Sequence, residues 1–243
     1  MTQNIYDDEA FFAGYSRLPR SVAGLDGAPE WPALRALLPP LGGRRVLDLG
    51  CGYGWFCRWA RAQGAGSVLG VDVSERMLAR ARAETDDAAI TYVRADLERF
   101  TAAPGAFDLA YSALAFHYLE NLAGLLAGVR AALVPGGALV FSAEHPIYTA
   151  PAHPGWSAGA AGRSTWPVDG YLDEGPRSTD WLAKGVIKQH RTIGTYIDLL
   201  LRAGFAIAHV NEWGPSPEQV AAHPEWANER ERPMFVLVAC VTQ

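Results

Sequence analysis

Three glycines at alternate positions follow an apolar segment in RRVLDLGCGYGWFCRWA, residues 44–60. Gly50, Gly52 and Gly54 separate the strand-like sequence RVLDLG from a helix-compatible segment. Because glycine has no Cβ and adopts positive φ at little cost, a ligand can come close to the backbone at such a turn. The helix that follows offers free backbone N–H groups. The pattern predicts an α/β chain that holds a nucleotide-like ligand at the end of its first strand.

The chain continues with alternating strand-like and helix-like segments. Apolar runs typical of buried parallel strands occupy 45–50, 67–73, 90–96, 107–114 and 138–145, and two further strands follow residue 204. Helices are predicted at 54–63, 75–84, 121–133 and 192–204. Ser74 is the expected N-cap of the second helix, and Pro135 to Gly137 are expected to end the third. This alternation predicts βαβ units.

Two families of nucleotide-binding proteins compete for the glycine pattern. The dinucleotide fingerprint G-x-G-x-x-G/A needs a small residue at position 55, where this chain has Trp55. The alternative pattern D-x-G-x-G-x-G is filled completely by Asp48, Gly50, Gly52 and Gly54. In this motif the chain resembles the class I S-adenosylmethionine-dependent methyltransferases. Asp72, which lies 72 − 48 = 24 residues after Asp48, and Asp96 end the next two predicted strands, as acids do in that family.

The resemblance, dense over residues 42–145, implies a set of cofactor contacts. It places Gly50, Cys51 and Gly52 at the methionine part, Asp72 and Val73 at the ribose, and Ala95, Asp96 and Leu97 at the adenine, and it makes Asp48 of the same motif a cofactor-binding residue. Met77, Ser112 and His117 are further implied contacts, and Tyr15 and Arg20 in the N-terminal segment are candidates. No metal ligand is expected, because Cys51, Cys57 and Cys240 form no CxxC pair.

The resemblance also implies the architecture. We expect a Rossmann-like, doubly wound seven-stranded sheet in the order 3-2-1-4-5-7-6, with helices on both faces and an antiparallel last strand. The single methyltransferase domain would span 1–243, as an N-terminal lid (1–41), a cofactor-binding core (42–145), a substrate-covering insertion (146–190) and the C-terminal part of the sheet (191–243). Aromatic residues in the lid and the insertion are expected to be divided between core and pocket wall.

A hydroxyl or protonated amine has to lose a proton when it acts as the nucleophile, so a general base with a near-neutral pKa assists the reaction. Histidine is the side chain that fits this role. His145 directly follows the fifth strand and His190 precedes a helix, so both are expected near the carboxyl edge of the sheet. Arg191 beside His190 favours His190 as the base, with His145 as a hydrogen-bond partner of the substrate. Catalysis by alignment alone is the alternative.

Composition narrows the classes of molecule that the protein is expected to bind. A formal net charge of −5 with scattered Lys and Arg argues against nucleic acid, and no run long enough to cross a membrane occurs. The acidic N-terminus and unpaired cysteines favour a cytoplasmic protein, a monomer or homodimer. Methyl transfer to a small, partly aromatic organic acceptor is therefore the leading prediction. Two alternatives remain: a protein that binds the cofactor without transferring a methyl group, and a nicotinamide-dependent oxidoreductase.

Overall fold

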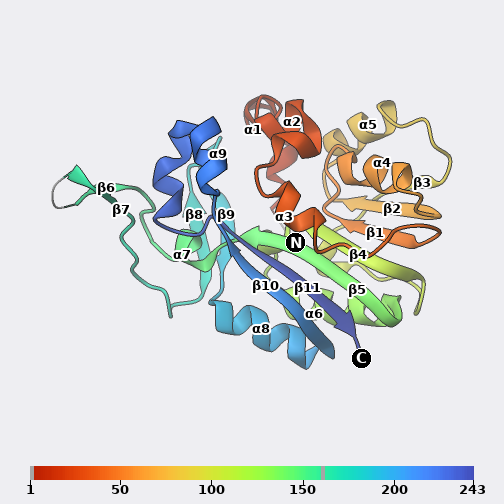
Figure 1. Cartoon of the computed structure of the whole chain (residues 1–243). Helices are drawn as coiled ribbons and strands as arrows, with labels where there is room; N and C mark the ends of the chain where they lie inside the picture. The colour runs from red at the N-terminus through yellow and green to blue at the C-terminus, as the bar shows by residue number, and fades with distance from the viewer. Residues whose placement is uncertain (1–2, 160–161) are drawn as a thin grey trace.

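The fold, seen in a computed structural model that describes residues 3–159 and 162–243, is built on one twisted sheet (Figure 1). Its seven strands run in the order β10-β11-β5-β4-β1-β2-β3, which confirms the predicted order and the antiparallel last strand. The strands are β1 (Arg45–Leu49), β2 (Ser67–Asp72), β3 (Ile90–Arg94), β4 (Phe107–Ala113), β5 (Leu133–Glu144), β10 (Phe205–Trp213) and β11 (Phe235–Thr242).

Helices cover both faces of this sheet. On one face α3 (Trp31–Arg35), α4 (Trp55–Ala62) and α5 (Glu75–Ala83) pack on Val46, Val68 and Leu237. On the other face α6 (Leu122–Ala132) and α8 (Ile193–Arg202) pack on the neighbouring residues that point the opposite way, such as Leu47 and Val236. Successive strand residues point to opposite faces, so strands that are apolar at nearly every position bury both sides.

The N-terminal segment and the insertion lie beside the carboxyl ends of the parallel strands (Figure 1). The N-terminal segment contains a 3₁₀ turn, η1 (Ile5–Asp7), and the short helices α1 (Glu9–Tyr15) and α2 (Pro19–Val22). The insertion contains α7 (Pro146–Thr149), the hairpin of β6 (Ser157–Ala158) and β7 (Ser164–Thr165), and the hairpin of β8 (Gly175–Thr179) and β9 (Val186–His190). A further helix, α9 (Pro217–Ala222), and η6 (Pro224–Arg230) connect β10 to β11.

The predicted turn at Pro135 to Gly137 is wrong in one respect. Helix α6 already ends at Ala132, and β5 begins at Leu133, before the proline. Phe107 pairs with Leu133 and Leu109 with Ala138, so the Pro-Gly-Gly sequence forms a bulge inside the strand, where Gly136 has a φ of +72°. A proline and two glycines fit a bulge because these residues form no regular ladder there.

No helix in the described ranges is long and apolar enough to cross a membrane.

Candidate functional site

A pocket of about 300 Å³ opens at the carboxyl ends of β1, β2, β4 and β5. Gly50 and Gly52 after β1, Asp72 at the end of β2 and Glu144 at the end of β5 line it. The N-terminal segment, the insertion and the start of β11 form its other walls. Open parallel sheets bind ligands at this edge, because the strand ends and the helix N-termini that follow converge there.

Most residues predicted as cofactor contacts meet in this pocket. Those lining it are Tyr15, Arg20, Gly50, Gly52, Asp72, Val73, Met77, Asp96, Leu97 and His117. Asp48 and Cys51 line a smaller pocket of about 100 Å³, which shares Gly50, Gly52 and Tyr15 with the larger one. Ala95 and Ser112 are absent from both linings: the backbone N–H of Ala95 donates to the Asp72 carbonyl, and the Ser112 hydroxyl donates to the Leu49 carbonyl.

The glycine loop (residues 50–54) exposes its backbone to the pocket. Gly50 and Gly52 have φ values of +79° and +51°, which an L side chain rarely adopts. A Cβ built on Gly52 would meet no atom of the described residues within 4 Å, so bare backbone faces open space there. That space, in a pocket also lined by the Asp72 carboxylate and the apolar side chains of Met77 and Leu97, fits the nucleoside and methionine parts of the expected cofactor.

The Asp72 carboxylate is fixed by two backbone donors. Its Oδ2 accepts from the Gly52 N–H at 2.9 Å, and its Oδ1 accepts from the Ser74 N–H at 2.9 Å. Burial raises the pKa of Asp72, and the two backbone hydrogen bonds oppose that rise. Each carboxylate oxygen can accept more than one hydrogen bond, so both can still bind ligand hydroxyls.

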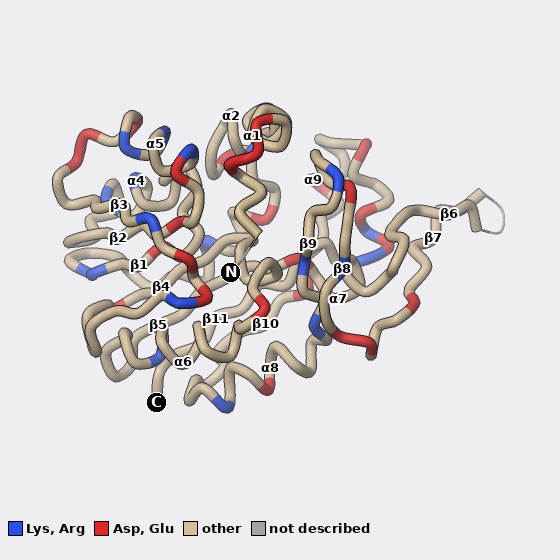
Figure 2. The backbone as a smooth tube through the Cα atoms, turned by 180° about the vertical axis from the view of Figure 1, so that it is seen from behind, with Lys and Arg blue, Asp and Glu red and all other residues tan. Residues whose placement is uncertain are grey.

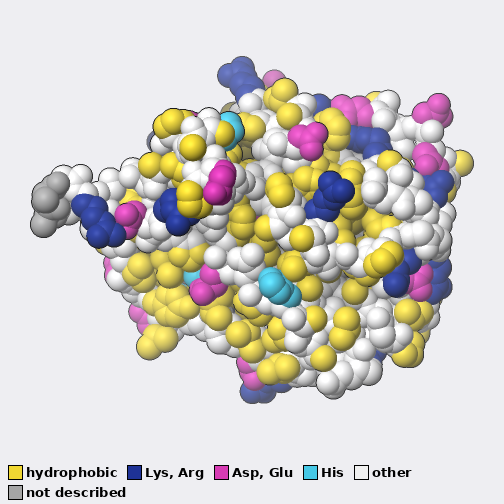
Figure 3. All heavy atoms as spheres, viewed as in Figure 1, with side chains coloured by type: hydrophobic (Ala, Val, Ile, Leu, Met, Phe, Trp, Pro, Cys, Tyr) yellow, Lys and Arg dark blue, Asp and Glu magenta, His cyan; other side chains and the backbone are white. Residues whose placement is uncertain are grey.

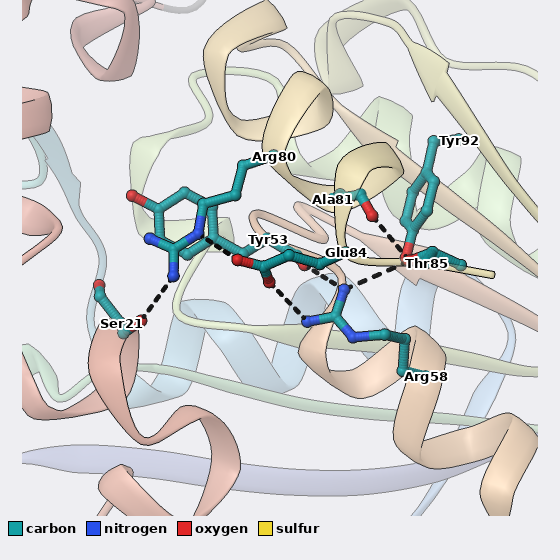
Figure 4. A network of polar contacts seen from close by, with 8 residues as sticks. All are labelled: Ser21, Tyr53, Arg58, Arg80, Ala81, Glu84, Thr85 and Tyr92. Atoms are coloured by element: carbon teal, nitrogen blue, oxygen red, sulfur yellow. Dashed lines mark hydrogen bonds and ion pairs between the residues drawn. The ribbon is translucent and has the colours of Figure 1, made fainter.

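A polar network ties the glycine loop to the helices behind it and to the N-terminal segment (Figure 4). Glu84 accepts from Arg58 at 3.2 Å and from Arg80 at 2.6 Å. Arg58 also donates to the Tyr53 carbonyl at 2.7 Å, and the Arg80 guanidinium lies 4.0 Å from the Tyr53 ring centroid. Arg80 reaches the Ser21 carbonyl at 3.4 Å. The network therefore holds the loop backbone against α4 and α5.

The motif aspartate lies under the loop in an apolar setting. Asp48 is 2% exposed, and its Oδ2 accepts from the Cys57 thiol at 3.2 Å. Burial raises the pKa of Asp48 to about 7 and that of Cys51 to about 11. A thiol with a pKa of about 11 is almost entirely protonated at neutral pH, so Cys51 has the character of a buried packing residue and not of a nucleophile.

We expect Asp48→Asn to change how stability depends on pH. Between pH 3.8 and about 7 the folded state holds a proton on Asp48 that the unfolded state has lost, so stability falls as pH rises through this window. Asparagine does not titrate. The free energy of unfolding of the variant relative to the parent should therefore increase by about 2–4 kcal/mol from pH 4 to pH 7. Urea unfolding at several pH values measures this, and a constant difference would contradict the raised pKa.

Glu144 in the pocket lining is paired with a buried lysine. Glu144 accepts from the Lys188 ammonium group at 2.5 Å through Oε1, and Lys188 is 2% exposed. Glu144 Oε2 is buried and has no hydrogen-bond partner among the described residues. His117 Nδ1 accepts from the Glu144 N–H at 3.3 Å, and burial lowers the pKa of His117 to about 4. His117 is therefore neutral near pH 7 and carries its proton on Nε2.

The two histidines predicted as base and substrate partner lie outside the pocket lining. His145 Nδ1 accepts from the Ile147 N–H, and its Nε2 donates to Glu212 at 2.8 Å. His190 donates from Nε2 to the Tyr171 carbonyl at 2.9 Å, and its Nδ1 lies 2.8 Å from the Thr149 hydroxyl. Both rings are buried and both nitrogens of each are engaged. Neither ring directs a nitrogen into the pocket lining in this structure, so the base role of these histidines stays a prediction.

Aromatic residues line the pocket, as sequence analysis predicted for some of those in the lid and the insertion. Tyr6, Tyr15 and Trp181 line it together with Tyr148. Trp31 lines the smaller pocket, and Phe11 is fully buried core. The lining also contains residues that sequence analysis did not select: Tyr118, Glu229, Arg232 and Met234. Glu229 and Arg232 come from the connection before β11, where no periodicity or motif distinguishes them.

No group of three or more His, Cys, Asp or Glu side chains that could hold a metal ion occurs within residues 3–159 and 162–243.

Comparison with known proteins identifies the family of this chain. Residues 47–141 match a family described as a methyltransferase domain. A crystal structure of an S-adenosylmethionine-dependent methyltransferase from Mesorhizobium loti is 61% identical, with a TM-score of 0.87, and the alignment covers 90% of this chain and all of that one.

Two curated relatives extend the comparison. An uncharacterized protein of Haemophilus influenzae is 32% identical over 93% of this chain and 90% of its own length. A malonyl-[acyl-carrier protein] O-methyltransferase of Enterobacter lignolyticus is 41% identical over only 45% of this chain and 43% of its own length. From the full-length match to the Mesorhizobium loti enzyme, together with the glycine loop and the strand-end carboxylates, we conclude that this chain belongs to the S-adenosylmethionine-dependent methyltransferases.

Proposed function

We propose that this methyltransferase modifies a small, partly aromatic organic acceptor bound between Glu144 and the aromatic walls of the large pocket. The observation that carries the proposal is the enclosure of the strand ends by Tyr6, Tyr15, Tyr148 and Trp181. An aromatic-lined pocket with a few polar groups is typical of sites for small organic ligands. In this proposal the chain is one domain in which residues 1–41 and 146–190 cover the acceptor.

The proposed cofactor contacts are those that the family resemblance implies, and the presence of most of them in the pocket lining supports them. Asp72 would accept hydrogen bonds from the ribose hydroxyls, Asp96 and Leu97 would contact the adenine, and the glycine loop would lie along the methionine part. Bound S-adenosylmethionine supplies an electrophilic methyl group on a positively charged sulfur. The residues of the chain then have to align the acceptor, exclude water and remove a proton.

Glu144 is the residue that we propose to orient and deprotonate the acceptor. Its Oε1 is held by Lys188, which fixes the carboxylate, and its Oε2 is left to accept a hydrogen bond. An O–H or N–H of the acceptor would donate to Oε2 and give up its proton there as the acceptor's bond to the methyl carbon forms and the bond between that carbon and the cofactor sulfur breaks, with S-adenosylhomocysteine as the leaving group. His117, neutral and beside Glu144, would donate from Nε2 toward the same region.

Charge supports a small acceptor over a nucleic acid. The net charge is −5, and the Lys and Arg residues are spread over the chain and intermixed with Asp and Glu (Figure 2). In the face shown in Figure 3 the basic side chains are scattered among hydrophobic and acidic ones. A nucleic-acid site needs a continuous basic surface. The malonyl-[acyl-carrier protein] methyltransferases match at most half of this chain, so their acceptor is not assigned to it.

The test is a screen of phenols, aromatic amines and their acids for formation of S-adenosylhomocysteine, with the methylated product identified by mass spectrometry. We expect turnover with at least one such acceptor, and we expect Trp181→Ala to reduce it about tenfold or more while the affinity for S-adenosylmethionine stays within twofold. Turnover with a protein or transfer-RNA substrate and with none of the small acceptors would contradict the proposal.

A further prediction concerns His145 and His190. Because both ring nitrogens of His145 and of His190 are engaged away from the pocket, we expect His145→Gln and His190→Gln to lower thermal stability but to leave the pH dependence of turnover unchanged. Rate profiles from pH 5 to pH 9 measure this. Loss of the acidic limb in either variant would restore that histidine as the base.

A further inference from the structure

We infer that the acceptor is an aromatic acid that places its carboxylate on Arg232 and its hydroxyl or amine on Glu144; this inference rests on the proposed function and names its substrate class. Arg232 lines the large pocket and is 6% exposed. Its Nε and Nη1 are buried and have no hydrogen-bond partner within the part of the chain that the structure describes. Buried donors without a partner are rare in folded proteins, and each costs free energy until an acceptor arrives.

The position of the Arg232 guanidinium is set by aromatic rings. It lies 4.1 Å from the Trp166 ring centroid, 4.6 Å from that of Tyr148 and 5.0 Å from that of Trp156. Cation–π contacts of this kind hold a guanidinium in place while its N–H groups remain available at the edges. Tyr148 and Trp166 are stacked, with an interplanar angle of 9°, so the cation rests on a rigid aromatic surface.

Among the described residues that line the pocket, Arg232 is the cation left to bind an anion, because the Arg20 guanidinium already donates to both carboxylate oxygens of Glu30. Glu144 is paired with Lys188, and His117 is neutral because burial lowers its pKa to about 4. Glu229 lies 3.0 Å from Arg232 Nη2 and neutralises part of its charge, but it engages one nitrogen of the three. Burial lowers the pKa of Arg232, which a bound carboxylate would counteract. An anion therefore finds its donors at Arg232 and not at Lys188.

The Tyr148 ring lies close to both polar groups of the proposed site, Arg232 and the pair of Glu144 and Lys188. Tyr148 has the Arg232 guanidinium 4.6 Å and the Lys188 ammonium group 5.6 Å from its ring centroid. Glu144 Oε1 lies 2.5 Å from that ammonium group. An acceptor with an anion at one end and a hydroxyl or amine at the other, joined by an aromatic ring, would run along Tyr148. The methylated atom is the one on Glu144, so the carboxylate remains free in the product.

The experiment compares acids with their neutral amides. Hydroxybenzoates and aminobenzoates, and the matching primary amides, are titrated by calorimetry into the protein saturated with S-adenosylhomocysteine. We expect at least one acid to bind tenfold or more tightly than its amide. In Arg232→Gln the two should bind within about twofold of each other, and in Arg232→Lys part of the preference should remain. The matched control is Arg163→Gln, because Arg163 is an exposed arginine paired with Glu231.

The outcomes separate this inference from the proposed function. Equal binding of acids and amides, binding of none of the acids, or a preference that survives Arg232→Gln would overturn it; the first two comparisons use the unaltered protein, so they stand even if a variant fails to fold. Turnover of uncharged phenols or amines as fast as of the acids would leave the proposed function standing and overturn the inference. Arg232-dependent binding of an acid without methylation of any small acceptor would support the acid site and contradict the proposed function.

Discussion

Asp72→Ala is expected to weaken the binding of S-adenosylmethionine about 100-fold or more. The Asp72 carboxylate is held in the pocket by the Gly52 and Ser74 N–H groups, and we propose that it accepts both ribose hydroxyls. Two hydrogen bonds to a charged group contribute about 1.5–3 kcal/mol each, and 1.4 kcal/mol corresponds to a tenfold change in affinity. Calorimetry with S-adenosylmethionine and S-adenosylhomocysteine measures the loss.

Two variants serve as comparisons for Asp72→Ala. Asp96→Ala should weaken binding less, because its expected contact is a single neutral donor of the adenine. Asp198→Ala removes an exposed carboxylate that pairs with Arg202 on α8 and should leave cofactor affinity unchanged. Thermal unfolding checks that each variant is folded. A folded Asp72→Ala protein with parental affinity would remove Asp72 from the cofactor site.

Glu144→Gln is expected to reduce turnover about 10²–10⁴-fold, the usual contribution of a general base. The amide keeps the size of the side chain but cannot take a proton. Cofactor affinity should stay within about twofold, because Glu144 is not among the proposed cofactor contacts. Single-turnover measurements at pH 6 to pH 9 separate the chemical step from product release.

The control for Glu144→Gln is a carboxylate on β10, which β11 separates from β5. Glu212 is 58% exposed, pairs with His145 and is absent from the pocket lining. Glu212→Gln should keep parental turnover. The double variant Glu144→Gln/Lys188→Met tests whether an unpaired buried lysine, and not the missing base, causes the loss. If Glu144→Gln turns over at the parental rate, Glu144 is no base and the acceptor is aligned by the walls alone.

The strands and the position of the site could be predicted because they depend on local patterns. Short stretches of sequence are enough to recognise the apolar runs, the glycine loop and the acids at the ends of β2 and β3. Parallel strands then bring their carboxyl ends to one edge of the sheet. The sheet order then followed from the resemblance to the family. The bulge at Pro135 to Gly137 could not be predicted, because turn and bulge use the same residues.

The direction in which His145 points could not be predicted from the sequence. Glu144 and His145 are neighbours at the end of β5, and adjacent residues there turn to opposite sides. Glu144 enters the pocket, and His145 turns toward Glu212 on β10. Which of two adjacent polar residues faces the ligand depends on the sheet as a whole. Arg232 was missed for a related reason, since its place is set by Tyr148 and Trp166, which are distant in sequence.

A crystal structure of the protein bound to S-adenosylhomocysteine tests the central claim most directly. The account predicts that the ligand lies along the glycine loop, with both ribose hydroxyls on the Asp72 carboxylate, the adenine beside Asp96 and Leu97, and the sulfur facing the part of the pocket that contains Glu144 and Tyr148. A ligand bound elsewhere, or bound here with its sulfur directed away from Glu144, would contradict it.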